Sequence, residues 1–234
     1  ATYTENEELS IPAASGLHLI VDSENGEITV RPWSGSDILV TATKSVSAWT
    51  SGRARNVADT IRIEVAQTWD TVRIRAAFRH YFFVRQKVSY DILVPADWIG
   101  QVELITSTGA ISAEGVNGDV HLHTSNGRIN VDGHAGRLTV RTSNGSVEVR
   151  DVDTVLYARS SNGRITIHDA VLRGTGEIRT SNGRITLQGA FHGGADYEVR
   201  TSNGDVELRL RHPIDLAVDL NTSNGSVRLD GVEV

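Results

Sequence analysis

The sequence predicts an all-β protein, a parallel β-solenoid of about seven rungs of 18–21 residues with an N-terminal β cap region. Two observations support this fold class. The tripeptide Ser-Asn-Gly recurs six times at nearly constant spacing in the second half of the chain, and a fixed period of this length is typical of repeat architectures. On both sides of each copy, apolar residues alternate with polar ones at a period of two, which indicates two short strands per unit.

Each copy of the tripeptide is expected to form the same corner of the solenoid. Neighbouring rungs of a parallel stack lie about 4.7–4.9 Å apart, so the Asn side chains would form a hydrogen-bonded amide ladder, and Gly would supply a positive φ without steric cost. A degenerate copy, TSTGAIS, places Thr108 at the same position 18 residues before the first full copy. The predicted turn ladder consists of Asn126 and Gly127, Asn144 and Gly145, Asn162 and Gly163, Asn182 and Gly183, Asn203 and Gly204, and Asn224 and Gly225.

A meander of antiparallel hairpins is the alternative, because Asn-Gly between alternating strands is also a strong hairpin signal. A meander would need a second tight turn between units, yet the connecting segments, such as DGHAG and DVDTV, are irregular. It would also give no reason to repeat Ser-Asn-Gly so faithfully. These points favour the solenoid.

The first hundred residues differ from the repeats and are rich in aromatic residues. We expect an extended N-terminal arm at residues 1–16, an aromatic-rich β region continuous with the solenoid at 17–100, and the repeat β-solenoid at 101–234. Segments 36–44, 60–66, 70–76 and 80–95 have strand-like patterns, and the polar stretch SVSAWTSGRARN at 45–56 is predicted to be a long loop. The strand order within 44–90 is not encoded in any repeat.

Composition excludes several classes of function. The chain has 234 residues, a formal net charge of −6, and neither Cys nor Met, so disulfides and thiolate chemistry are impossible. The absence of a basic excess argues against nucleic-acid binding. The sequence has no apolar run of about 18 residues, so no membrane span is predicted. A chain that begins with Ala1 fits a mature product after removal of a signal peptide, or a trimmed chain.

Several segments resemble a known family. They are LHLIVDSENGEITVRPWSGSDILVTATKSV at 17–46, VSYDILVP at 88–95, and the run of TSNG-centred units that follows. Together they are similar to the DUF4097 putative-adhesin family of β-solenoid proteins over roughly residues 17–234. The resemblance implies a parallel β-solenoid and an extracellular or cell-envelope setting. It implies no established activity and supplies no functional residues.

Outward-facing arginines form the first candidate site. Three residues before each Asn, the chain has His123, Arg141, Arg159, Arg179, Arg200 and Asn221. Glu177 and Glu198 are placed to pair with Arg179 and Arg200, which leaves the lower arginines less neutralised. Arg suits bidentate capture of carboxylate or phosphate. We therefore consider a site for an acidic polysaccharide or other polyanion, with a solvated, salt-bridged face as the plainer alternative. The candidate residues are Arg128, Arg141, Tyr157, Arg159 and Arg164.

We expect neither a cofactor, a metal site nor a catalytic centre. His121 and His123 share an outward face, but no third ligand is evident. No G-x-S-x-G, P-loop or H-E-x-x-H motif is present, and the recurring Thr, Ser and Asn lack a fixed His partner. An enzyme acting on polysaccharides is the least favoured hypothesis.

The two ends of the rod are the second candidate site. The last rung, NTSNGSVRLDGVEV, is expected to leave an open strand edge at Val227 and Leu229, and an open edge can pair with another strand. The apolar run AAFRHYFFVRQ contains Phe82 and Phe83, which mark a second partner surface if they are exposed. The leading hypothesis is a non-catalytic, extracytoplasmic structural protein that associates head-to-tail into a surface filament or adhesin-like assembly. A closed head-to-head dimer, and a monomeric or dimeric binding module for acidic polysaccharide, are the alternatives.

Overall fold

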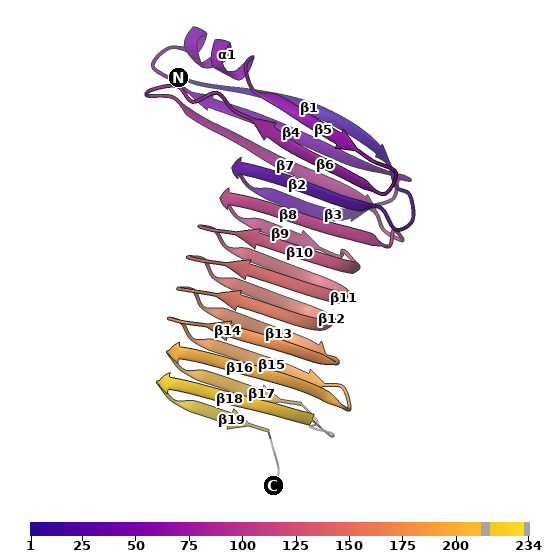
Figure 1. Ribbon diagram of the computed structural model, residues 1–234, viewed down its shortest axis with the longest axis vertical. Coiled ribbons are helices and arrows are strands. Elements are labelled where there is room, and N and C mark those ends of the chain that lie inside the picture. The colour runs from indigo at the N-terminus through magenta and orange to yellow at the C-terminus, as the bar shows by residue number, and fades with distance from the viewer. Residues whose placement is uncertain (212–215, 232–234) are drawn as a thin grey trace.

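The computed structural model describes residues 1–211 and 216–231, and it is an elongated rod built almost entirely of strands (Figure 1). The elements are β1 (Thr2–Pro12), β2 (His18–Asn25), β3 (Ile28–Trp33), β4 (Asp37–Ser47), α1 (Ser51–Ala58), β5 (Arg62–Gln67), β6 (Thr71–Ala77), β7 (Arg85–Pro95), β8 (Gly100–Thr108), β9 (Ile111–Glu114), β10 (Gly118–Thr124), β11 (Ile129–Thr142), β12 (Val147–Ser160), β13 (Ile165–Leu172), β14 (Thr175–Thr180), β15 (Ile185–Phe191), β16 (Ala195–Asn203), β17 (Val206–Leu210), β18 (Leu216–Asn224) and β19 (Val227–Asp230).

The predicted parallel β-solenoid is confirmed. Strands that precede the Asn-Gly corners stack in one ladder, here called sheet A, and strands that follow the corners stack in another, sheet B. Sheet A contains in order β5, β6, β2, β8, β10, residues 136–142 of β11, residues 154–160 of β12, β14, β16 and β18. Sheet B contains in order β1, β4, β7, β3, β9, residues 129–132 of β11, residues 147–150 of β12, β13, β15, β17 and β19.

The segments between units are more regular than the sequence suggested. One residue in each of these segments pairs in register with its counterpart in the next rung, which gives each of these rungs a short third side. The paired residues are His134, Val152, Ala170 and Gly189. The chain bends into that side at Gly133, Asp151 and Asp169, whose φ angles are 69°, 49° and 51°. Glycine and aspartate tolerate this left-handed conformation better than most other residues do. The same bend therefore forms in all three rungs although the residue at the bend differs.

Antiparallel strands close the N-terminal end of the rod. β1 pairs antiparallel with β4, and β4 with β7, at the end of sheet B. β5 pairs antiparallel with β6 at the end of sheet A. These pairings supply the strand order that the sequence left open, and β1 occupies most of the expected N-terminal arm.

The loop predicted at 45–56 is wrong at both ends, because β4 continues to Ser47 and α1 begins at Ser51. Thr50 caps the helix: its side chain accepts a hydrogen bond from the Arg53 N–H at 3.2 Å, which satisfies one of the free donors of the first turn. The helix buries Ala54, Val57 and Ala58. Its polar composition and Gly52 hid this amphipathic turn from a periodicity search.

The Thr-Ser-Asn-Gly corners form a continuous hydrogen-bonded column. Each Asn from Asn144 to Asn224 donates its side-chain N–H to the Asn Oδ1 one rung earlier, always at 2.8 Å. The amide ladder predicted from the sequence is therefore present. The Asn backbone N–H groups of Asn144, Asn162, Asn182 and Asn203 also donate to the Ser carbonyl of the preceding rung, at 2.8–2.9 Å.

The Thr or Ser two residues before each Asn completes the column. Its buried hydroxyl donates to the carbonyl of the Gly one rung earlier, as Thr142 does to Gly127 at 3.1 Å and Thr180 does to Gly163 at 3.0 Å. Every residue of the repeated tetrapeptide thus bonds the neighbouring rung through its side chain, its backbone or both.

The reason for glycine at the corner differs from the expected one. Gly127, Gly145, Gly163, Gly183 and Gly225 do not have a left-handed φ. Instead, a Cβ on Gly163 would lie 1.7 Å from the carbonyl oxygen of Gly145, and a Cβ on Gly145 would lie 1.6 Å from that of Gly127. Glycine is required because each corner lies directly on the one before it.

We predict that Gly163→Ala lowers the free energy of unfolding by about 1–3 kcal/mol, because the methyl group must push two rungs apart. Urea unfolding followed by circular dichroism measures this loss. Gly193→Ala is the matched control, since a Cβ there meets nothing within 4 Å. Equal stability of the two variants would contradict the close-stacking explanation.

Candidate functional site

The outer face of sheet A presents stacked basic side chains. The register places His123, Arg141, Arg159, Arg179 and Arg200 in one column, each paired directly with its neighbour in the next rung. Alternation of the strand points these side chains outward, while the residues on either side, such as Val140 and Thr142 beside Arg141, are buried. The strict period of the repeat therefore produces a ladder of like charge.

Carboxylates neutralise part of this column, in a different order from the one expected. Glu177 pairs with Arg159 of the preceding rung rather than with Arg179 of its own. Glu198 pairs with Arg200 at 3.3 Å, as the sequence predicted. Among the described residues, no carboxylate lies within ion-pair distance of Arg141 or Arg179. Arg141 is therefore the basic residue of the lower column whose charge is least compensated.

A shallow hollow lies beside Arg141 on this face. Its volume is about 340 Å³, and its polar lining is His121, His123, Arg141, Tyr157 and Arg159, with Glu103 at one end. The Asp119 carboxylate accepts a hydrogen bond from the His121 Nε2–H at 2.9 Å in the tautomer that carries its proton on that nitrogen. The hollow combines one aromatic ring, two guanidinium groups and two imidazoles.

The structure brings together three of the five residues suggested for polyanion binding. Arg141, Tyr157 and Arg159 line the hollow. Arg128 and Arg164 lie beyond the Asn-Gly corner and do not line it. Arg128 instead donates from Nε to the Ser146 hydroxyl one rung later, at 3.1 Å. The candidate site is thus smaller than the sequence suggested, because the corner turns Arg128 and Arg164 away from the strand face.

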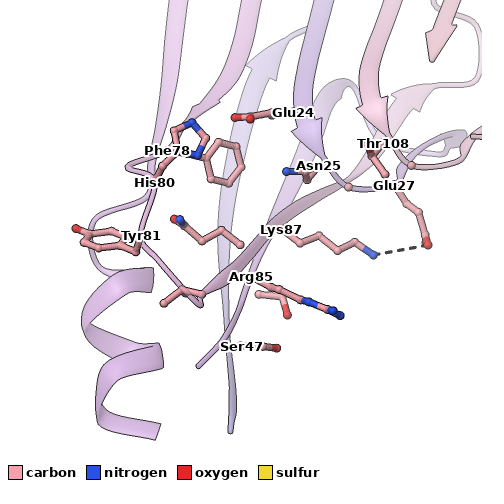
Figure 2. Close-up of a pocket in the computed structure, with 15 residues that line it drawn as sticks. Glu24, Asn25, Glu27, Ser47, Phe78, His80, Tyr81, Arg85, Lys87 and Thr108 are labelled. Atoms are coloured by element: carbon pink, nitrogen blue, oxygen red, sulfur yellow. Dashed lines mark ion pairs between the residues drawn. The ribbon is translucent and has the colours of Figure 1, made fainter. Parts of the chain in front are cut away.

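A second hollow lies in the cap, and the sequence analysis did not identify it (Figure 2). Its volume is about 670 Å³, and it forms between the first corner, Glu24–Glu27, and the segment that leads into β7. Phe78 and Tyr81 contribute aromatic surface, and Lys87 pairs with Glu27 at 3.6 Å. The unusual apolar run at 76–86 was the available signal, but it did not reveal which corner it would cover.

That apolar run is divided between the cap hollow and the solvent. Phe78 and Tyr81 line the hollow, whereas Phe82 and Phe83 are 88% and 84% exposed. Phe83 has a φ of 59°, which is strained for a bulky side chain. The strand pattern expected from residue 80 begins only at Arg85, because this turn precedes β7.

The last described rung exposes residues that are buried in every earlier rung. Val227 and Leu229 are 45% and 47% exposed, whereas Val206 and Leu208, their partners in register, are each 1% exposed. Asp205 holds this rung to the stack by accepting hydrogen bonds from the Ser226 hydroxyl and N–H at 2.7 and 3.1 Å. These bonds, and then Arg184, hold the pKa of the Asp205 carboxyl below its usual range.

His134 is a buried titratable group on the third side of its rung. Its Nδ1 lies 2.5 Å from the carbonyl oxygen of Val116, and the side chain is 3% exposed. Burial lowers the pKa of His134 from its ordinary value of 6.5, against the opposing effects of backbone hydrogen bonds and Asp119. The imidazole therefore resists protonation in the folded protein.

No group of three or more His, Cys, Asp or Glu side chains suited to a metal ion occurs among residues 1–211 and 216–231. Within the same residues, the single helix is too short and too polar to cross a bilayer.

The fold and its corner column define a class, that of parallel β-solenoids with an antiparallel N-terminal cap. Residues 17–233 match the model of the Toastrack family DUF4097, and the chain belongs to this family. A protein from Parabacteroides merdae described as a putative adhesin has 13% identity and a TM-score of 0.51, with 98% of this chain and 96% of that chain covered. Another from Parabacteroides distasonis has 15% identity and a TM-score of 0.48, with 97% of each chain covered. No curated protein matches the chain.

We predict that the stability of the protein falls as the pH is lowered below about 6.5. As the pH falls, His134 is protonated in the unfolded chain before it is protonated in the folded chain. Each unit of pH decrease therefore lowers the free energy of unfolding by at most about 1.4 kcal/mol. Thermal unfolding between pH 7 and pH 5 measures this slope. His134→Gln should flatten it, whereas His123→Gln, on the outer face, should not. Equal slopes for all three proteins would contradict the assignment.

Proposed function

We propose that this chain is a non-catalytic, rod-shaped protein of the cell surface that binds acidic polysaccharide, or a similar polyanion, on the outer face of sheet A. Membership of the Toastrack family and the adhesin description of the P. merdae protein support a surface role. The likeness to that structure is one of fold, so the binding role depends on this chain's own residues.

The observation that carries the proposal is the uncompensated Arg141 in the hollow beside Tyr157. A guanidinium group offers several N–H donors in a plane and binds carboxylate or sulfate oxygens in pairs. Arg159 lies one rung away in register, so its backbone is about 4.8 Å further along the rod, and its guanidinium, which pairs with Glu177, also lines the hollow. Tyr157 supplies a flat surface for a sugar ring. The arrangement suits a chain that carries repeated negative charges and sugar faces.

The rest of the molecule favours a local rather than a general attraction. The net charge is −6, so the chain as a whole repels polyanions and any attraction must come from local basic groups such as those of this face. Such an interaction between exposed charges is screened by salt, with a Debye length of about 10 Å at 0.1 M. We therefore expect binding at low ionic strength that weakens steeply as salt is added.

We predict that Arg141→Ala with Arg159→Ala weakens binding to heparin and polygalacturonate by roughly tenfold or more, because two charge-assisted contacts are lost. Isothermal titration calorimetry at two salt concentrations measures the change, and neutral dextran tests for charge dependence. Arg128→Ala with Arg164→Ala is the matched control, since it removes the same charge beyond the corner.

Three results would contradict the proposal. Binding that is equal for both double variants would mean that only total charge matters. Loss of binding in the Arg128 and Arg164 variant alone would move the site around the corner. Shortening of the polysaccharide during incubation with the chain would overturn the non-catalytic part.

A second proposed property is self-association through the rung formed by β18 and β19. The exposed Val227 and Leu229 favour it, because each is an inward-facing core residue that lacks a covering rung in the described part of the chain. The sequence suggested a head-to-tail filament first and a closed head-to-head dimer second. In the first arrangement, exposed Phe82 and Phe83 at the cap would help to form the joint.

A further inference from the structure

We propose that two copies of this chain form a closed head-to-head dimer in which β18 and β19 pair antiparallel with the same strands of the second copy. A single twofold axis passes beside Leu220 and Leu229. This inference rests on the self-association proposed above, and it names the partner and the symmetry.

The backbone of β19 is oriented for such a pair. The Val206 N–H donates to the Ser226 carbonyl at 2.9 Å, so the backbone groups of Ser226 and of alternate residues after it point back to β17. The N–H and C=O groups of Val227 and Leu229 consequently point to the free edge. In an antiparallel pair, a residue with both groups on the shared edge exchanges two hydrogen bonds with the residue opposite. Leu229 can therefore lie opposite Leu229 of the second copy.

The side chains of β19 are self-complementary in this register. With Leu229 on the axis, Arg228 lies opposite the second copy's Asp230, and Asp230 lies opposite its Arg228. These are non-hydrogen-bonded positions, where opposing Cα atoms approach to about 4.5 Å and side chains interact most closely. Within one chain the two groups already pair at 3.2 Å. The dimer doubles these ion pairs, while Val227 and Leu229 gain cover.

Sheet A fits the same axis. In β16, the Asp196 N–H donates back to Gly174 at 2.9 Å. Asp196 pairs with Ala217 in β18, so the same alternation points the backbone of Leu220 to the free edge. Leu220 lies four residues before Asn224, and Leu229 lies four residues after Gly225, so the two are level across the rung. An axis through both places Asp219 opposite Asn221 of the second copy, an acceptor opposite a donor.

The opposite end of the rod is a poorer partner for this edge. β1 forms the outer edge of sheet B there, and it carries Glu5, Glu7 and Glu8. Only Glu7 has a cationic partner among the described residues, Lys44 at 2.8 Å. Charged side chains on an edge strand discourage pairing with another strand. A closed dimer uses one self-complementary edge and leaves this acidic edge in solvent.

Charge reversal tests the proposed register directly. Arg228→Asp places like charges opposite each other at both ion pairs of the dimer, and so does Asp230→Arg. Such pairs should weaken dimerisation by roughly tenfold or more. An equimolar mixture of the two variants restores both attractive pairs, so we expect heterodimers where each variant alone is monomeric. Sedimentation velocity across a wide concentration range, with one variant fluorescently labelled, measures this.

Control variants exclude simple misfolding and the other symmetry. Arg150→Asp changes the corresponding column in an interior rung, where Arg150 pairs with Glu148, and should leave dimerisation unchanged. Phe82→Ser with Phe83→Ser should also leave it unchanged, because the cap takes no part in the head-to-head joint. Circular dichroism confirms the fold of each variant.

The outcomes separate this inference from the proposal on which it rests. A wild-type chain that stays monomeric at every concentration overturns self-association itself. A wild-type chain that associates, but whose charge variants behave alike singly and mixed, overturns the register while self-association stands. Oligomers that lengthen with concentration and disappear when Phe82 and Phe83 are replaced establish the head-to-tail order instead. Dimers restored only by mixing support the proposed axis.

Discussion

The close approach of one Gly corner to the next is the constraint on which the rest of the structure depends. The Thr or Ser hydroxyl reaches the Gly carbonyl of the preceding rung only because no Cβ intervenes, as at Gly145 and Gly163. Once the corners are in contact, the Asn side chains fall at hydrogen-bonding distance and both sheets acquire a fixed register. The corner therefore sets the spacing of the strands as well as the turn of the chain.

This fixed register also determines what the surface can do. Identical positions in successive rungs lie above one another, so an outward Arg becomes a column of Arg, and an inward Leu becomes a continuous core. Among the described residues, Arg141 lacks the carboxylate partner that Arg159 and Arg200 have. The same periodicity leaves the last described rung with the bonding pattern of an interior rung, and this is why its strand edge is suited to a partner.

The repeated half of the fold was predictable from the sequence because each rung repeats the same pattern of corner residues and alternating apolar residues. The Asn ladder, the stacked Arg column and the inward apolar residues followed from counting positions. The reason for glycine at the corner could not be predicted, because a left-handed φ and a close approach of two backbones both favour glycine. The cap depends on long-range antiparallel pairing of β1, β4 and β7, which has no period to reveal it. Single contacts also escaped prediction, such as the Tyr197 hydroxyl, which accepts from the Leu156 N–H at 3.0 Å. The split of the Arg site at the corner likewise required the three-dimensional path of the chain.

Amide hydrogen exchange at the corners, followed residue by residue with nuclear magnetic resonance, tests the central claim most directly. The Asn144, Asn162 and Asn182 N–H groups lie in exposed turns, where a hairpin would leave them free to exchange rapidly with solvent. In the stacked column each donates to a Ser carbonyl at 2.9 Å, so the account predicts protection comparable to that of the flanking strands. Rapid exchange at these three positions, with the strands protected, would contradict the account.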